Sequence, residues 1–340
     1  MINNENINTN QQLGISILRI VSTFSVILIH VSGPLVVKFG EIPLMDWYIA
    51  NIFDGLSRYS VPMFFMISGA LLLSKDYKLY YFIKKRFGKI IPPFLFWSLI
   101  YSLLNRYVFN SEIFRVDKVI RDIFYGSEYH LWFVYALMGI YLITPIIRKW
   151  IKNASQNEIL YVLIIWLFTL IIGIPGFNNY FPKINLSYFT GFIGYFVLGY
   201  FLKQFAGNRQ KFAILAIAFG AFITIVGTSY FTLKNSTFYP YFYEYLNLNT
   251  LLVALGVFLF FNKINVTNDR LKELLLKLNQ CCFGIYLIHP LVLKVFILNG
   301  FNLNGLNPAI AIVLIVLLCF LLSFIIIYCL KSLKIGYLMT

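Results

Sequence analysis

Charged residues are scarce in this sequence. Lysine, arginine, aspartate and glutamate make up 12% of its 340 residues, whereas 60% are hydrophobic. A soluble domain averages about 25% charged and about half apolar residues, so this composition excludes an ordinary soluble protein. Apolar runs of about 20 residues recur between polar breaks, which is typical of membrane-spanning helices. The alternating segments of about 10 residues that build a membrane β-barrel are not visible, and we therefore predict an all-α, polytopic membrane protein.

Cysteine is also scarce. None of the four cysteines shows the C-x-x-C or Cys/His spacing of a metal site, so we expect no bound metal and no disulfide framework. The chain also lacks a small-residue cleavage site after its first apolar run, which is longer than the core of a signal peptide. We expect that run to be retained as a membrane span that follows a short polar N-terminal tail, 1–13.

Ten apolar segments are long enough to be counted as spans of a single transmembrane domain, 1–340. These segments are 14–37, 50–73, 90–109, 129–147, 158–175, 187–203, 211–233, 247–262, 280–299 and 308–330. Most lysine and arginine residues fall in alternate loops, at 75–89, 148–152, 203–211 and 263–277, and in the tail after 330. The positive-inside rule therefore places both termini in the cytoplasm. The net charge of +15 then reflects topology, so we predict a multi-pass protein of the plasma membrane without a nucleic-acid partner.

The first span carries one arginine, Arg19, and one histidine, His30. Ionisable side chains inside a span are costly, and they usually face the protein interior. The spacing of eleven positions is three helical turns and about 20°, so both side chains lie on one helix face, roughly 16 Å apart. A cation at one depth and an imidazole at another are typical of a path for a ligand that enters from one side and reacts further in.

Histidine is the usual general base near neutral pH. The sequence has two histidines besides His30, namely His130 and His289, and each of them could instead hydrogen-bond a neighbouring helix as a structural residue. A carboxylate close to the His30 imidazole would orient it and stabilise its charged form. Glu128 and Asp54 are both candidates for that carboxylate, and the sequence leaves the choice open.

A second polar group lies in the predicted second span. Asp54 and Arg58 stand four residues apart, a spacing at which side chains pair on a helix. They form either a salt bridge at the outer membrane face or part of a polar cavity that opens outward. The outer segment 110–129 is rich in charged residues, and Trp132 follows it. Aromatic side chains beside polar groups suit sugar binding, although they also anchor proteins at membrane interfaces.

A basic cluster precedes the predicted third span, which the proline pair 92–93 is expected to begin. The cluster consists of Lys84, Lys85, Arg86 and Lys89. Basic side chains at a helix end bind phosphate groups well, arginine through bidentate geometry. A cytoplasmic loop that contacts anionic lipid headgroups would have the same composition, so both interpretations stay open.

Several segments together point to a known family. They are the R-x10-H pair of the first span, F-F-x-x-S-G at 64–69, KKRFGKIIPPFLFW at 84–97, YHLWFVYALMGIYLITPII at 129–147 and Y-L-x-H-P at 286–290. In this order, and over roughly 14–330, the sequence resembles the acyltransferase type 3 family of membrane proteins. It resembles those members that consist of the membrane domain alone.

The resemblance implies transfer of an acyl group, commonly acetyl, from cytoplasmic acyl-CoA to a hydroxyl of a cell-surface glycan or a lipid-linked sugar. It implies that His30 is catalytic and that Arg19 lies near the acyl-CoA. An R-x-x-R motif of the family is associated with the phosphates of coenzyme A. Arg86 matches this motif, but Lys89 replaces the second arginine and lacks its bidentate fork. Ser68, in the F-F-x-x-S-G segment, is expected to contact the donor as well.

Taken together, these expectations describe an integral membrane O-acyltransferase. The expected catalytic residues are His30, Arg19 and Glu128. The residues expected to bind the acceptor are Asp54, Arg58, Trp132 and His289. Direct transfer and a covalent acyl-enzyme both stay open. The alternative is a transporter or flippase for a polysaccharide or lipid-linked sugar, in which the same polar residues would line a permeation path.

Overall fold

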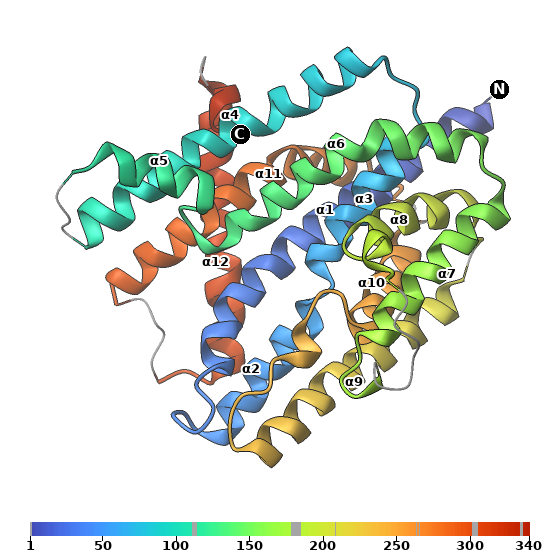
Figure 1. Ribbon diagram of the computed structural model, residues 1–340. Helices are drawn as coiled ribbons and strands as arrows, with labels where there is room; N and C mark the ends of the chain where they lie inside the picture. Colours follow the sequence, from blue (N-terminus) through green and yellow to red (C-terminus); the bar gives the residue numbers. More distant parts are fainter. Residues whose placement is uncertain are drawn as a thin grey trace. The chain divides into compact units, whose positions relative to one another are not determined.

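The computed structural model describes residues 2–110, 114–177, 185–207, 209–262, 264, 266–300, 305–333 and 336–340. Over these residues the chain is helical and contains no strand, as the apolar pattern predicts. The helices, labelled in Figure 1, belong to two compact units. Unit 1 contains Met1–Lys75, Ile146–Asn279 and Leu303–Leu317, and unit 2 contains Asp76–Pro145, Gln280–Asn302 and Leu318–Thr340.

Seven helical segments within the described residues are long and apolar enough to cross a membrane. They are Leu13–Val36, Leu79–Phe109, Tyr129–Asn153, Gln210–Asn235, Tyr241–Phe261, Asp269–Leu298 and Pro308–Ser332. These segments support a multi-pass membrane protein. The number of ten spans and the cytoplasmic position of both termini stay predictions.

Unit 1 is built mainly from seven helices. They are α1 (Ile2–Val36), α2 (Leu44–Ser57), α3 (Ser60–Leu72), α7 (Gln156–Ile172), α8 (Ile193–Phe205), α9 (Gln210–Asn235) and α10 (Leu248–Phe261). Helix α1 packs on α2, α3 and α10, while α9 packs on α2 and α10. The short helices η4 (Ser187–Phe189) and η5 (Tyr241–Tyr243) also belong to this unit. Because α1 begins at Ile2, the polar N-terminal tail is helical as well.

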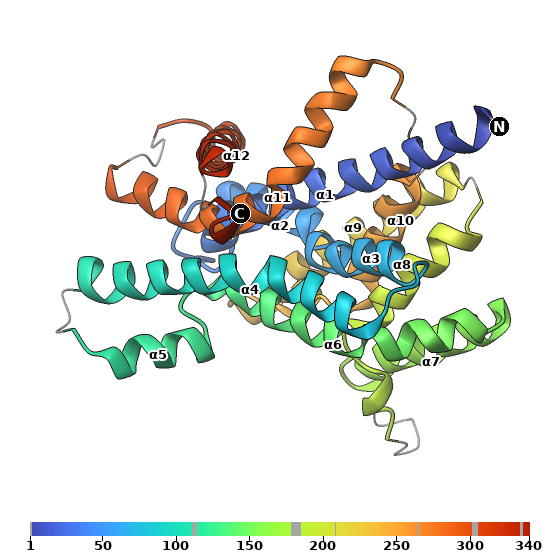
Figure 2. The ribbon, with the colours of Figure 1, turned by 90° about the horizontal axis from the view of Figure 1, so that it is seen from above.

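Helices α3 and α8 lie side by side in both ribbon views (Figure 1; Figure 2). Two glycines allow this close approach. A Cβ atom at Gly69 would lie 1.7 Å from the carbonyl oxygen of Phe196, and one at Gly199 would lie 2.0 Å from that of Met66. Small residues of this kind let helix backbones touch in membrane proteins. The glycine of the F-F-x-x-S-G segment is therefore explained by helix packing.

Unit 2 contains α4 (Leu79–Leu103), which continues into the π-helical turn η1 (Leu104–Phe109), and α5 (Val116–Tyr125). The short helices η2 (Tyr129–Leu131) and η6 (Gly336–Leu338) belong to it too. Three further helices contribute one part each: α6 (Trp132–Asn153) up to Pro145, α11 (Asp269–Leu298) from Gln280, and α12 (Pro308–Ser332) from Leu318. Figure 2 shows α5 running alongside α4, which it contacts.

The predicted second span, 50–73, is not one helix. Helix α2 ends at Ser57 and α3 begins at Ser60, with Arg58 and Tyr59 between them. Pro62 has no N–H, so the carbonyl of Arg58, four residues earlier, has no helical donor. The interruption therefore follows from the proline.

The predicted start of the third span at the proline pair 92–93 is wrong. Helix α4 begins at Leu79 and contains Pro92 and Pro93. Their missing N–H groups deprive only the carbonyls of Gly88 and Lys89, and both of these residues are exposed. Solvent or headgroups can hydrogen-bond these carbonyls, so the helix tolerates both prolines.

Two segments predicted as loops contain helix. Helix α5 lies within 110–129, and α11 begins at Asp269 rather than near 280. The side chain of Asn268 accepts a hydrogen bond from the Leu271 N–H at 3.1 Å, so Asn268 acts as an N-cap that the sequence reading did not recognise. Within these predicted polar segments and the C-terminal tail, residues 111–113, 263, 265 and 334–335 lie outside the described residues.

Candidate functional site

Arg19 and His30 lie on the uninterrupted helix α1 of unit 1, and both are half-buried. The continuous helix puts them on one face, as their spacing predicts. The Nη1 of Arg19 donates to the Oδ1 of Asn279 at 2.6 Å, and the hydroxyl of Thr23 donates to the Arg19 carbonyl at 2.8 Å. Asn279 therefore orients the guanidinium from a position 260 residues away in the chain.

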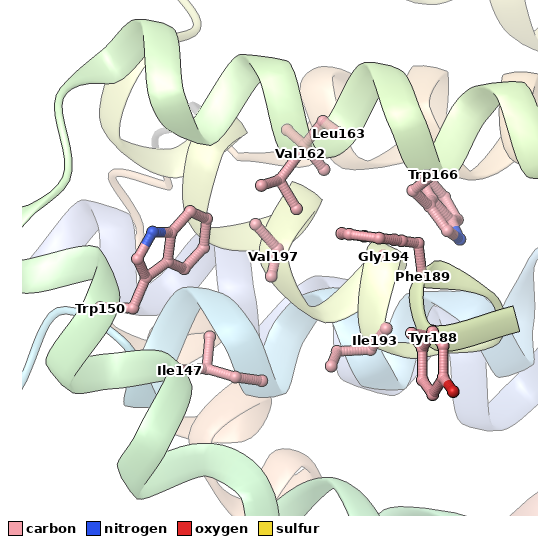
Figure 3. A pocket seen from close by; sticks show the side chains of 10 residues that line it. All are labelled: Ile147, Trp150, Val162, Leu163, Trp166, Tyr188, Phe189, Ile193, Gly194 and Val197. Atoms are coloured by element: carbon pink, nitrogen blue, oxygen red, sulfur yellow. The ribbon is translucent and has the colours of Figure 1, made fainter. Parts of the chain in front are cut away.

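Unit 1 also contains an open apolar pocket of about 230 Å³ (Figure 3). It is lined by Ile147, Trp150, Val162, Leu163, Trp166, Tyr188, Phe189, Ile193, Gly194 and Val197. The Trp166 ring covers Gly194 so closely that a Cβ atom there would lie 2.0 Å from it. Since this lining contains no carboxylate, imidazole or cation, the pocket lacks the groups that proton transfer needs.

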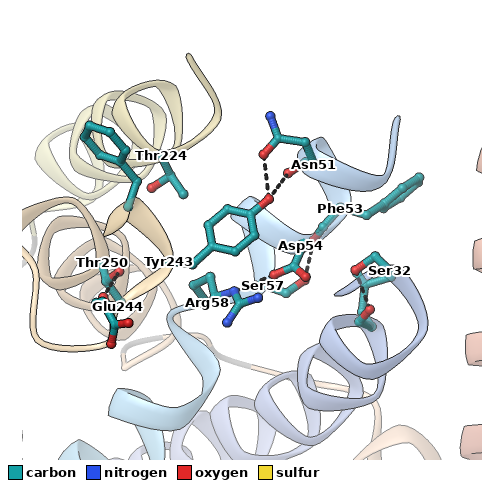
Figure 4. Close-up of polar contacts among 12 residues, drawn as sticks. Ser32, Asn51, Phe53, Asp54, Ser57, Arg58, Thr224, Tyr243, Glu244 and Thr250 are labelled. Carbon is teal, nitrogen blue, oxygen red and sulfur yellow. Dashed lines mark hydrogen bonds and ion pairs between the residues drawn. The ribbon is translucent and has the colours of Figure 1, made fainter. Parts of the chain in front are cut away.

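Asp54 and Arg58 form a buried ion pair in unit 1, and the predicted pairing of these residues is confirmed. The Nε of Arg58 donates to the Oδ1 of Asp54, and the two side chains are 17% and 0% exposed. The Arg58 guanidinium lies 4.2 Å from the centre of the Tyr243 ring, a cation–π contact. The Tyr243 hydroxyl in turn donates to the Oδ1 of Asn51 at 2.5 Å (Figure 4). Helix α2 and the segment before α10 thus hold the pair in a polar network.

Glu128 belongs to a separate network in unit 2. Its Oε2 accepts from the Nζ of Lys294 at 2.6 Å and from the Nδ2 of Asn105 at 3.0 Å. Lys294 also donates to the Oδ1 of Asn105 at 2.7 Å. The Glu128 side chain is 6% exposed, so its charge is neutralised mainly by Lys294. These contacts do not test the predicted role of Glu128 in catalysis, which stays a prediction.

A pocket of about 520 Å³ opens beside Glu128 in unit 2. It is lined by Phe124, Tyr125, Gly126, Ser127, Glu128, Tyr129, Trp132 and Tyr135. Trp132, one of the lining residues, is 39% exposed. Aromatic faces next to a carboxylate offer both stacking surface and hydrogen-bond acceptors, which are the groups that a polyhydroxylated ring needs.

Asp122, on α5, is held by the π-helical turn at the end of α4. The guanidinium of Arg106 donates to both of its carboxylate oxygens, at 2.6 and 2.7 Å, and the hydroxyl of Ser102 donates at 2.6 Å. The hydrogen bond from Arg106, followed by that from Ser102, holds the pKa of Asp122 below its ordinary value. This ion pair fixes α5 on α4.

His289 stands where α11 loses a backbone hydrogen bond. Pro290 has no N–H, so the carbonyl of Tyr286 lacks its helical donor. The Nδ1 of His289 lies 2.7 Å from that carbonyl oxygen, and because a carbonyl only accepts, Nδ1 carries the proton. The buried imidazole then has its lone pair on Nε2, and its ring centre lies 5.4 Å from that of His130. The predicted role of His289 in acceptor binding stays a prediction beside this structural one.

Tyr101 of α4 is inserted into the same part of α11. Its hydroxyl donates to the Leu287 carbonyl at 2.7 Å and accepts from the Leu291 N–H at 3.3 Å. These two backbone groups would bond each other in a regular helix, so the phenol interrupts their hydrogen bond. The Y-L-x-H-P segment is therefore a helix distortion that side chains of both helices stabilise.

The basic cluster lies on the first turns of α4, in unit 2. Lys84 and Lys89 are exposed, whereas Lys85 and Arg86 are half-buried. Lys85 donates to the Tyr81 hydroxyl at 3.0 Å, so an aromatic residue orients part of the cluster. Exposed cations on one helical stretch are compatible with binding of phosphate groups. Ser68 is half-buried on α3, in unit 1.

The structure thus groups the predicted residues by unit. Arg19, His30, Asp54, Arg58 and Ser68 belong to unit 1, and Glu128, Trp132, His289 and the basic cluster belong to unit 2. The sequence did not predict the partners of these residues, namely Asn279, Tyr243, Lys294 and Asn105, nor Tyr101, which bonds the backbone next to His289. Lys294 was the most detectable of them, because a lysine inside an apolar run calls for a partner. Within the described residues, no group of three or more His, Cys, Asp or Glu side chains could hold a metal ion.

The comparison with protein families now decides the class of the protein. The sequence profile of the type 3 acyltransferases, described as an acyltransferase domain, matches residues 12–328. The chain belongs to the acyltransferase type 3 family. This type 3 acyltransferase is also 24% identical over 346 residues to "Putative membrane-bound acyltransferase YfiQ" from Bacillus subtilis (strain 168), over 95% of this chain and 92% of that protein. No solved structure matches the chain.

Membership in the acyltransferase type 3 family confirms the resemblance seen in the sequence. The protein is accordingly a membrane acyltransferase with several apolar helices. Family membership favours this activity over the alternative of a transporter or flippase.

Proposed function

We propose that this acyltransferase moves an acyl group such as acetyl from cytoplasmic acyl-CoA to a hydroxyl of a cell-surface glycan or lipid-linked sugar, in the plasma membrane. The observation that carries the proposal is the pair Arg19 and His30 on one continuous apolar helix. A cation and an imidazole are rarely kept inside such a helix without a functional reason. The hydrogen bond from Arg19 to Asn279 also holds the cation in a defined position.

The proposed reaction needs one base and one oxyanion stabiliser. His30 takes the proton of the acceptor hydroxyl while its oxygen attacks the thioester carbonyl carbon. A C–O bond forms, the C–S bond breaks, and the thiolate of coenzyme A leaves and receives the proton from the imidazolium. Arg19 stabilises the negative charge that develops on the carbonyl oxygen. This description is of direct transfer from donor to acceptor.

Two further parts of the proposal concern binding. The basic cluster binds the phosphates of acyl-CoA. Two observations support this role: Lys84 and Lys89 are exposed, and the Tyr81 hydroxyl orients Lys85 by a hydrogen bond. The acceptor sugar binds at the aromatic pocket that contains Trp132 and Glu128, supported by the exposed aromatic faces beside a carboxylate. Each of these two roles is testable by itself, with a variant on one site only.

The catalytic assignment is tested with the purified full chain in lipid nanodiscs, isotopically labelled acetyl-CoA and envelope glycans as acceptors. His30→Ala is expected to lower the transfer rate about 10²- to 10⁴-fold, the usual contribution of a general base, with an unchanged melting temperature. Ser32→Ala is the matched control on α1, because within the described part of the chain its hydroxyl donates to the carbonyl of Leu28 in the same helix, at 2.7 Å, and to no other group. Near-normal turnover by a folded His30→Ala protein would refute the assignment.

A further inference from the structure

The carboxylate of Asp54 has one oxygen that its surroundings do not explain. Oδ1 accepts the hydrogen bond of Arg58, whereas Oδ2 is buried and has no hydrogen-bond partner among the described residues. The Asp54 side chain is 0% exposed. Buried carboxylate oxygens are nearly always hydrogen-bonded, because an unpaired one loses its hydration without compensation. This oxygen can therefore accept one more hydrogen bond.

The oxygen faces helix α1. A Cβ atom built on Gly33 would lie 3.1 Å from Oδ2, so the carboxylate occupies the space that a side chain at this position would need. His30 lies one turn earlier on α1, and Cβ atoms three residues apart on a helix are about 5–6 Å from each other. Helices α1 and α2 pack on each other within unit 1. The Asp54 carboxylate thus lies beside the helix face that carries His30.

We propose that Asp54 is the positioning residue of His30. When the acceptor hydroxyl binds, Oδ2, which has no partner among the described residues, accepts a hydrogen bond from one ring nitrogen of His30. The lone pair of the other nitrogen is then left for the proton of the hydroxyl. The carboxylate stays ionised and stabilises the imidazolium until the proton passes to the leaving thiolate. Arg58 holds the carboxylate in place through Oδ1. The inference rests on the proposed function and answers which carboxylate orients the base.

The elements packed against this part of α1 offer few competing groups. Helices α3 and α10 carry no titratable side chain over Ser60–Leu72 and Leu248–Phe261. Apart from Asp54 and His30, the described charged or titratable side chains on α1 and α2 are Arg19, three turns away, and Asp46 and Tyr48 of α2. Between α2 and α3 they are Arg58 and Tyr59, whose hydroxyl bonds Ser25 at 2.9 Å. Among these described groups, Asp54 is the buried carboxylate.

Asp54→Asn keeps the shape of the side chain and removes its charge. With labelled acetyl-CoA and the full chain in nanodiscs, kcat is expected to fall at least 10-fold while the KM for acetyl-CoA stays within about twofold. The acid limb of the kcat–pH profile is expected to move to lower pH, because the imidazolium loses its carboxylate. Asp122→Asn is the matched control: it also breaks an Asp–Arg pair, and the acid limb should stay where it is in the wild type.

Gly33→Ala provides a second variant that keeps both charges. Its methyl group would press on Oδ2 and is expected to lower kcat several-fold with little change in KM. Wild-type kcat and an unmoved acid limb in a folded Asp54→Asn protein would overturn the inference and make Asp54 purely structural. Should Asp54→Asn fail to fold, wild-type kcat of Gly33→Ala overturns it instead. If the wild-type protein transfers no label from acetyl-CoA at all, the proposed function itself fails, which is a distinct result.

Discussion

Replacing Gly69 by alanine is expected to destabilise the protein strongly, although the change adds only one methyl group. The new Cβ atom would lie 1.7 Å from the carbonyl oxygen of Phe196 and 2.6 Å from its carbonyl carbon. Contacts under 3.0 Å are essentially never seen for real Cβ atoms. The obstacle is helix backbone, which cannot swing away as a side chain does, so α3 and α8 would have to separate by more than 1 Å.

The size of the effect follows from this geometry. Overpacking a core by a methylene typically costs about 1–3 kcal/mol, and a rigid backbone obstacle places Gly69→Ala at or above the upper end. Alanine gains about 1 kcal/mol over glycine as a helix former, which offsets part of the loss. The separation would also disturb the ring of Phe65 on α3, which stacks on Phe192 at 4.5 Å. We expect a net loss of about 2 kcal/mol or more.

Thermal unfolding in detergent, followed by tryptophan fluorescence, measures this loss. Gly88→Ala on α4 is the matched control, since its Cβ would meet no described atom within 4 Å, and it should melt at or above the wild-type temperature. Gly199 sits at the same crossing, so the double variant with Gly69 should lose less than the sum of the two single changes. Wild-type melting of Gly69→Ala would show that the two helices are not in backbone contact and would refute the reasoning.

Two further predictions address the basic cluster and the α4–α5 ion pair. Arg86→Ala should raise the KM for acetyl-CoA roughly 10- to 100-fold with little change in kcat, since charge-assisted hydrogen bonds contribute about 1.5–3 kcal/mol. Lys149→Ala, at an exposed position, is the control. An unchanged KM of Arg86→Ala would argue against phosphate binding at the basic cluster. Because the pKa of Asp122 is lowered from its ordinary 3.8, its pair with Arg106 stabilises the fold above that pH and less as pH falls through the folded value. The melting-temperature gap between wild type and Asp122→Asn should therefore shrink below about pH 4, and a constant gap would contradict this.

The sequence predicted those features that depend on neighbours within a few helical turns. The shared face of Arg19 and His30 follows from the helical repeat, and the pairing of Asp54 with Arg58 from the four-residue spacing. Boundaries were predicted less well. The prolines of α4 looked like a helix start, but the exposed turn before them lets the helix continue. Local patterns alone do not reveal whether neighbouring carbonyls can find other partners.

Hydropathy by itself determined that this chain forms apolar helices, because a backbone in lipid must satisfy its hydrogen bonds within the segment. Only the tertiary structure decided which distant groups meet: Lys294 with Glu128, 166 residues apart, and Tyr101 with the Leu287 carbonyl, 186 apart. It also decided that an oxygen of Asp54 faces α1 at Gly33. Such contacts depend on how whole helices pack. The charge or apolarity of a residue shows that it needs a partner, but it does not identify that partner.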